Sequence, residues 1–254
     1  MPSIEEKLAK SLTAESTDLI PYLPYLLQDL WELGSSPNDM IHLISENIDV
    51  NETTRVLDLA CGKGAVSIHI AEKFGCRVKG IDIMSDFIEV ARQKSREYGV
   101  QSLCEYLTGD INESVIFEKN HDIVILGAVG DVLGNQLETL VKLSATIKRE
   151  GYVLLDDGYA RSQSEKPYLT KEKWLEVIRQ SGFELVADQS VSDAELSSVL
   201  DEQMECLARR TSELMDSYPE KAGLFEQYLK SQMSECAELE NDILGVTMLL
   251  KKVK

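Results

Sequence analysis

Two glycines and two aspartates lie in the part of the sequence best suited to bind a ligand. Residues 56–65 read VLDLACGKGA, an apolar run followed by a glycine turn and then by a helical pattern. Glycine lets the backbone turn tightly and approach a ligand, and the free N–H groups at the start of a helix can bind its polar atoms. Asp82 follows Gly62 by 20 residues, at the end of the next predicted strand. A carboxylate there can accept hydrogen bonds from both ribose hydroxyls.

Three further residues help to separate the two ligand classes that fit this pattern, a dinucleotide and an adenosine cofactor. Ser67 stands where a dinucleotide fingerprint has its third glycine. Asp58 precedes the glycines and suits a positively charged ligand group, such as a free amino group, better than a diphosphate. Asp110 follows the third predicted strand and can accept a hydrogen bond from the adenine amine. The pattern favours an adenosyl cofactor, with an NAD(P)-dependent oxidoreductase as the alternative.

Alternating strands and helices must position these residues. The pattern predicts strands over residues 55–60, 77–82, 104–107, 121–127, 152–155, 183–187 and 243–250. It predicts helices over residues 65–74, 85–98, 137–149 and 171–180, with Gly151 as the C-cap of the third. Such alternation is typical of a doubly wound α/β fold, in which helices cover both faces of a mostly parallel sheet.

With these motifs, the sequence resembles the class I S-adenosylmethionine-dependent methyltransferases that act on small molecules. The resemblance covers about residues 55–187 and the last strand, and it implies that this seventh strand is antiparallel. It also implies S-adenosyl-L-methionine as the cofactor. In many family members a glycine stands where this chain has Ala60. The cofactor-binding residues that the resemblance implies are Asp58, Ala60, Cys61, Gly62 and Gly64 at the methionine end, Asp82 at the ribose, Ile83, Met84, Asp110 and Ile111 around adenine, and Gly127 and Ala128 after the fourth strand.

The rest of the chain is predicted to embellish one methyltransferase domain spanning residues 1–254. Residues 1–47 form an N-terminal helical cap, 48–191 and 242–254 the Rossmann-like core, and 192–241 a helical insert with a corner near Pro219 and Gly223. Ligands bind beyond the carboxyl ends of parallel strands, where this insert begins. We therefore expect a lid over the cofactor, with a dimer contact as the alternative. Tyr22, Tyr25 and Trp31 are packing residues by default, and could close the other side.

Catalytic groups leave a weaker pattern. Asp131 follows the fourth strand, and Asp156, Asp157 and Tyr159 follow the fifth; Asp131, Asp157 and Tyr159 are the candidates for a general base. Methyl transfer needs a base only if the acceptor arrives protonated. The five cysteines include no CxxC pair, and the three histidines have no partner at ligand spacing, so no metal is expected.

The charge narrows the class of partner. Forty-four acidic and 26 basic residues give a formal net charge of −18, which disfavours nucleic acids and anionic membranes. After the fourth strand, residues 127–131 read GAVGD, without the Asn/Asp-Pro-Pro-aromatic run of nucleic-acid amino-methylating enzymes. We expect a cytoplasmic enzyme, monomeric or homodimeric, with a small-molecule methyl acceptor. A non-catalytic scaffold that binds the cofactor is a further alternative.

Overall fold

The computed structural model describes residues 3–161 and 168–253, so the predicted domain limits at residues 1 and 254 lie outside the described residues. The chain divides into two compact units. The sheet unit contains residues 31–159, 169–190 and 245–254, and the helical unit contains residues 1–30, 160–168 and 191–244. The division between the two units near residue 30 places α3 (Pro37–Asn47) in the sheet unit. The sequence pattern, by contrast, assigned residues up to 47 to the N-terminal cap.

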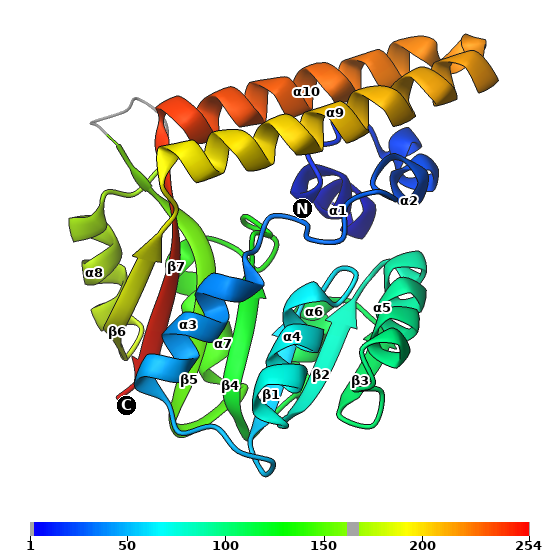
Figure 1. Ribbon diagram of the computed structural model, residues 1–254. Coiled ribbons are helices and arrows are strands. Elements are labelled where there is room, and N and C mark those ends of the chain that lie inside the picture. The colour runs from blue at the N-terminus through cyan, green and yellow to red at the C-terminus, as the bar shows by residue number, and fades with distance from the viewer. Residues whose placement is uncertain (1–2, 162–167, 254) are drawn as a thin grey trace. The chain divides into compact units, whose positions relative to one another are not determined.

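Seven strands form one sheet in the order β3-β2-β1-β4-β5-β7-β6 (Figure 1). β1 pairs in parallel with β2 and β4, β2 with β3, and β4 with β5, whereas β6 and β7 are antiparallel. The predicted doubly wound sheet with an antiparallel last strand is therefore confirmed. The strands are β1 (Arg55–Leu59), β2 (Arg77–Asp82), β3 (Cys104–Thr108), β4 (His121–Gly127), β5 (Ile147–Ala160), β6 (Phe183–Ser190) and β7 (Ile243–Lys252).

Helices of the sheet unit form two groups. α4 (Ala65–Phe74) contacts α3 and α5 (Ser85–Glu97), and α7 (Gln136–Ser144) contacts α6 (Ile111–Phe117) and α8 (Lys171–Gln180). Fully buried Ile68 of α4, Ile125 of β4 and Leu154 of β5 belong to one core cluster, which joins the first group to the sheet. This burial holds the carboxyl ends of β1, β4 and β5 at one edge, where the predicted binding residues lie.

The predicted helix over residues 137–149 is wrong at its C-terminal end. α7 ends at Ser144, and β5 begins at Ile147. Glu150 has a φ of 64°, in the left-handed region that a continuing helix cannot use. Gly151 is therefore a strand residue and not a helix C-cap. The register between β4 and β5 shifts between His121 and Ile123, which accommodates the polar residues at the start of β5.

The helical unit brings residues near the N-terminus together with the long helices that precede β7. α9 (Asp193–Ser217) and α10 (Ala222–Asn241) lie side by side (Figure 1), joined through η2 (Pro219–Lys221) at the predicted corner. α1 (Ile4–Ser11), η1 (Thr17–Tyr22) and α2 (Leu23–Leu26) precede the sheet, and α2 packs on α9. The Asp29 carboxylate accepts hydrogen bonds from Arg209 and Arg210 at 2.6–2.8 Å. Within the described ranges, none of the helices has the length and apolar character to cross a membrane.

Candidate functional site

Residues 60–64 after β1, named here the glycine loop, have backbone conformations that residues other than glycine rarely adopt. Ala60, Gly62 and Gly64 have φ values of 57°, 52° and 77°. Left-handed backbone is strained for alanine and accessible to glycine, so the two glycines fit the turn that Ala60 begins. Gly64 is the N-cap of α4, so no side chain caps the first amides of this helix. The uncapped first turn of α4 therefore lies directly after the loop, at the carboxyl edge of β1.

Asp82 organises this loop. Its Oδ2 accepts a hydrogen bond from the Gly62 amide, and its Oδ1 accepts one from the Met84 amide, both at 2.8 Å. Burial raises the pKa of Asp82, and these backbone N–H groups oppose the rise. The Gly109 amide donates to the Asp82 carbonyl at 2.9 Å, which places Asp110 beside the end of β2. The connecting segments that follow β1, β2 and β3 therefore meet at Asp82.

The remaining predicted adenine-side residues lie along these segments. Met84 and Ile111 are buried, with 7% and 5% of their surface exposed, and Ile83 is half-buried. Asp110 is the N-cap of α6, and its Oδ1 accepts a hydrogen bond from the Asn112 amide at 2.8 Å. A structural capping role therefore already accounts for one oxygen of Asp110.

Asp58 is a buried carboxylate under the loop. Only 3% of its surface is exposed, and its Oδ2 accepts a hydrogen bond from Ser67 Oγ at 2.5 Å. Burial raises the pKa of Asp58 to about 7, the Ser67 hydroxyl opposes the rise, and the nearby carboxylates of Asp82 and Asp156 add to it. Ser67, which the sequence pattern used only as a missing glycine, is thus the direct partner of Asp58.

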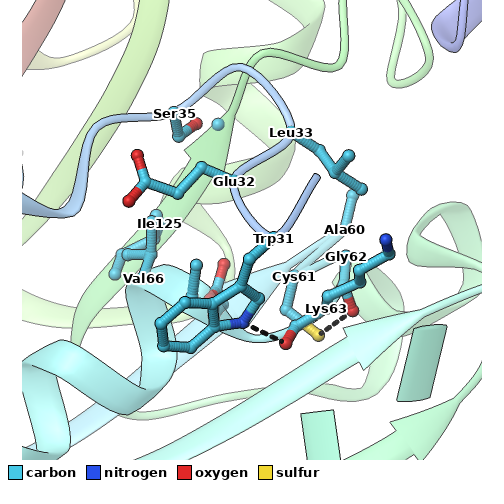
Figure 2. A pocket seen from close by; sticks show the side chains of 13 residues that line it. Trp31, Glu32, Leu33, Ser35, Ala60, Cys61, Gly62, Lys63, Val66 and Ile125 are labelled. Atoms are coloured by element: carbon cyan, nitrogen blue, oxygen red, sulfur yellow. Dashed lines mark hydrogen bonds between the residues drawn. The ribbon is translucent and has the colours of Figure 1, made fainter. Parts of the chain in front are cut away.

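A pocket opens above Asp58, with about 390 Å³ of empty space that includes space open to solvent. Figure 2 shows two chain segments around it: residues 31–35, named here the covering segment, and the glycine loop. Trp31 Nε1 donates a hydrogen bond to the Lys63 carbonyl at 3.1 Å, which links the covering segment to the glycine loop. The lining residues are Trp31, Glu32, Leu33, Ser35, Asp58, Ala60, Cys61, Gly62, Lys63, Ala65, Val66, Ile125 and Gly127.

The covering segment lies very close to the end of β4. A Cβ at Gly127 would lie 2.0 Å from Ser35 Oγ, and a Cβ at Gly34 would lie 2.8 Å from the Cβ of Ala128. Ala128 itself has a φ of 47°. Gly127, the last residue of β4, and Gly34 are therefore glycines because the covering segment packs closely on residues 127–128. The sequence pattern singled out Trp31 from this segment but not Glu32, Leu33 or Ser35, because five polar and apolar residues without periodicity carry no signal.

The three candidate general bases have different surroundings. Asp131 is exposed in the connection after β4, and Asp157 is exposed near the end of β5. Tyr159 is buried, and its hydroxyl donates a hydrogen bond to Asp188 at 3.0 Å. No group of three or more His, Cys, Asp or Glu side chains in residues 3–161 and 168–253 is arranged to hold a metal ion.

Solved structures share this fold. The crystal structure of a SAM-dependent methyltransferase from Thiobacillus denitrificans in complex with S-adenosyl-L-homocysteine aligns with a TM-score of 0.76 at 18% identity. The alignment covers 92% of this chain and 98% of that chain. The architecture is therefore that of the α/β methyltransferases.

A family model described as a methyltransferase domain matches residues 50–241. The chain belongs to this methyltransferase domain family. It is 27% identical over 167 residues to the ribosomal protein L11 methyltransferase of Exiguobacterium, covering 63% of this chain and 47% of that protein. It is 24% identical over 201 residues to phosphoethanolamine N-methyltransferase 1 of Zea mays, covering 78% of this chain and 38% of that protein. The chain thus spans less than half the length of these two curated relatives.

Proposed function

We propose that this enzyme transfers a methyl group from S-adenosyl-L-methionine to a small-molecule acceptor. One observation carries the proposal: the Asp82 carboxylate fixes a left-handed glycine loop through the Gly62 amide, beside a pocket with a buried acid at its base. When bound, S-adenosyl-L-methionine supplies an electrophilic methyl group on a sulfonium sulfur. Neither an NAD(P)-dependent oxidoreductase nor a non-catalytic scaffold is favoured for a member of a methyltransferase family.

The residues at this edge fit such a cofactor. Both oxygens of Asp82 accept backbone hydrogen bonds, and a carboxylate oxygen has a second lone pair that a ribose hydroxyl can use. Asp58 lines the pocket and offers a carboxylate to the cofactor's amino group. The left-handed turn at Gly62 and Gly64 lets the methionine end approach the backbone. Ile83, Met84, Asp110 and Ile111 would surround adenine, and Gly127 and Ala128 would face the sulfonium side.

A small acceptor is supported by the charge of the chain. A net charge of −18 disfavours nucleic acid. The names of the two relatives point to a ribosomal protein and to phosphoethanolamine as acceptors, so a protein acceptor is the competing outcome of any screen. Cytoplasmic location, a monomer or homodimer, and a lid role for residues 192–241 stay predictions.

Calorimetric titration with S-adenosyl-L-methionine, S-adenosyl-L-homocysteine and NAD tests the cofactor. We expect both adenosyl ligands to bind. In Asp82→Asn their affinity should fall about 10-fold or more, because the amide places N–H donors where the ribose hydroxyls donate. Glu105→Gln, which changes an exposed carboxylate of β3, is the matched control and should leave affinity unchanged. Binding of NAD alone would contradict the proposal.

A further inference from the structure

Asp156 is a carboxylate of β5, level with the end of β4 and on the pocket side of the sheet. The register between β4 and β5 places Gly127 opposite Asp156, and the register between β1 and β4 places Asp58 opposite Ile125. Alternate residues of a strand point to the same face, so Ile125 and Gly127 share a face. Asp58 and Asp156 therefore lie on this face too, and Asp58, Ile125 and Gly127 all line the pocket.

The two carboxylate oxygens of Asp156 differ in their hydrogen bonding. Oδ1 accepts a hydrogen bond from Thr247 Oγ1 of β7. Oδ2 is buried and accepts no hydrogen bond from any residue that the structure describes. Burial raises the pKa of Asp156 to about 6, and the neighbouring hydroxyls of Ser35 and Thr247 oppose the rise. At neutral pH this carboxylate is therefore mostly ionised. Within the described part of the chain, only the Ser35 hydroxyl stands by as a donor for its buried Oδ2, so a ligand that donates a full hydrogen bond to Oδ2 would stabilise the charge.

Ser35 Oγ fills the space that Gly127 leaves between the pocket and this oxygen. A Cβ at position 127 would lie 3.5 Å from Asp156 Oδ2 and 2.0 Å from Ser35 Oγ. Serine changes its χ1 rotamer at low cost, so the space beside Gly127 opens when one hydroxyl turns aside. A ligand group in the pocket can then reach Oδ2 directly.

The charges around this space favour a cation. Glu32 lines the same pocket, and the charges of Asp39 and Asp157 act on Asp156, whereas Asp58 is already assigned to the amino group of the cofactor. The ammonium group of Lys63, another lining residue, lies over the ring of Phe87 at 5.6 Å. An ammonium ion would supply both the missing donor and a compensating positive charge, whereas a neutral hydroxyl would supply only the donor.

We propose that Asp156 Oδ2 binds the amino group of the methyl acceptor, so that the acceptor is a small primary or secondary amine methylated on nitrogen. This inference rests on the proposed methyltransferase function and adds its substrate class. Asp156 is the catalytic residue of this step, and Thr247 is the positioning residue that fixes its carboxylate.

The chemistry balances with Asp156 as the proton acceptor. The amine enters as an ammonium ion and gives one proton to Oδ2, which leaves a lone pair on nitrogen. This lone pair forms the new N–C bond with the methyl carbon while the C–S bond breaks and its electron pair stays on sulfur. The product is a methylated ammonium ion, and Asp156 returns its proton to water.

Binding and turnover together test the assignment. The full-length protein is saturated with S-adenosyl-L-homocysteine and titrated calorimetrically with a panel of alkylamines, arylamines, amino alcohols and amino acids. Each amine is compared with the molecule in which a hydroxyl replaces the amino group. Transfer of labelled methyl from S-adenosyl-L-methionine to the same panel gives the second readout. The variants are Asp156→Asn and, as a matched control, Glu184→Gln, an exposed acid of β6.

We expect at least one amine to bind and to be methylated on nitrogen, with its hydroxyl counterpart binding about 10-fold more weakly or worse. Asp156→Asn should lose at least about 10-fold in amine affinity while its affinity for S-adenosyl-L-homocysteine stays within about twofold. Glu184→Gln should match the wild type. An unchanged amine affinity in Asp156→Asn, transfer only to oxygen or to a protein, or no binding of any amine would overturn the inference. Failure of S-adenosyl-L-homocysteine to bind would instead contradict the cofactor assignment.

Discussion

The Asp58 side chain must meet two opposing requirements. It must be buried to lie at the base of the pocket, and it must remain able to carry a negative charge toward a cationic ligand group. Burial raises its pKa to about 7, close to the pH at which an enzyme works. Ser67 Oγ donates a hydrogen bond to its Oδ2, which limits the rise. Without a ligand, the charged form of Asp58 therefore lowers the stability of the fold.

The variant Asp58→Asn should reveal this effect as a change in the pH dependence of stability. The pKa of Asp58 rises from 3.8 to about 7 on folding. Between these values the folded protein retains a proton that the unfolded chain has lost, so the contribution of Asp58 to stability falls as the pH rises toward 7. Asparagine keeps the acceptor for Ser67 but does not titrate. From pH 5 to 8 the variant should gain up to roughly 3 kcal/mol relative to the wild type.

Urea unfolding of the ligand-free protein at about pH 5, 6, 7 and 8 measures this difference. Glu105→Gln removes an exposed carboxylate and should follow the wild-type curve at each pH. Parallel curves for Asp58→Asn and the wild type would show that Asp58 titrates normally in the folded protein.

At the scale of elements, the glycine loop rests on a ring from another strand. Tyr106 of β3 is 4% exposed and fills the space between two glycines. A Cβ at Gly64 would lie 2.9 Å from its hydroxyl oxygen, and a Cβ at Gly80 would lie 2.7 Å from its Cδ1. A Cβ at Gly80 would also lie 2.9 Å from Cys61 Sγ in the loop. Gly80 of β2 is thus needed because a loop and a ring converge on it.

The variant Gly80→Ala should therefore destabilise the protein by about 1–3 kcal/mol, because the added methyl group must displace a buried ring or the loop. It should also weaken binding of S-adenosyl-L-homocysteine, since the displaced loop carries Gly62. Gly223→Ala is the control: it adds the same methyl group in the first turn of α10, where no atom lies within 4 Å. That change should be neutral or stabilising by up to about 1 kcal/mol. Equal urea midpoints for the two variants would refute this account of Gly80.

Elements with strong periodicity could be predicted from the sequence, and the others could not. The predicted helices at residues 65–74 and 171–180, and the strands at 77–82 and 121–127, match α4, α8, β2 and β4. Each has an apolar pattern with the period of its element and a clear boundary. The start of β5 was assigned to a helix because residues 148–150, KRE, are polar and favour helices. Pairing with β4 at His121 overrides that local preference.

The candidate site, too, could be predicted only where residue type and spacing carry a signal. The glycine loop and Asp82 carry their function in residue type and spacing, so the sequence predicts where they lie. Ser35 and Asp156 come together across 121 residues of sequence, through the packing of the covering segment on the end of β4. Contacts of this kind depend on tertiary packing, and single-sequence periodicity does not contain them.

At the scale of the whole molecule, charge is the dominant feature that composition alone sets. The excess of acids gives a formal net charge of −18. Like charges repel most in the compact folded state, which holds them closer together than the unfolded chain does. Ion pairs such as Asp29 with Arg210 offset part of this repulsion. An exposed pair contributes only about 0–1 kcal/mol, so a few such pairs cannot cancel the excess.

Salt should therefore stabilise this protein. Raising NaCl from about 20 mM to about 300 mM shortens the Debye length from roughly 20 Å to below 8 Å and screens repulsion between distant acids. It weakens the ion pairs too, but their opposite charges are in direct contact and are screened less. We expect the free energy of unfolding to rise by at least roughly 1 kcal/mol, which corresponds to about 2–4 °C in the thermal midpoint for a chain of this length. Sucrose at matched osmolality separates screening from general exclusion effects, because it leaves the Debye length unchanged. A midpoint that falls with NaCl would mean that ion pairs outweigh net repulsion, in which case the acidic surface is locally compensated.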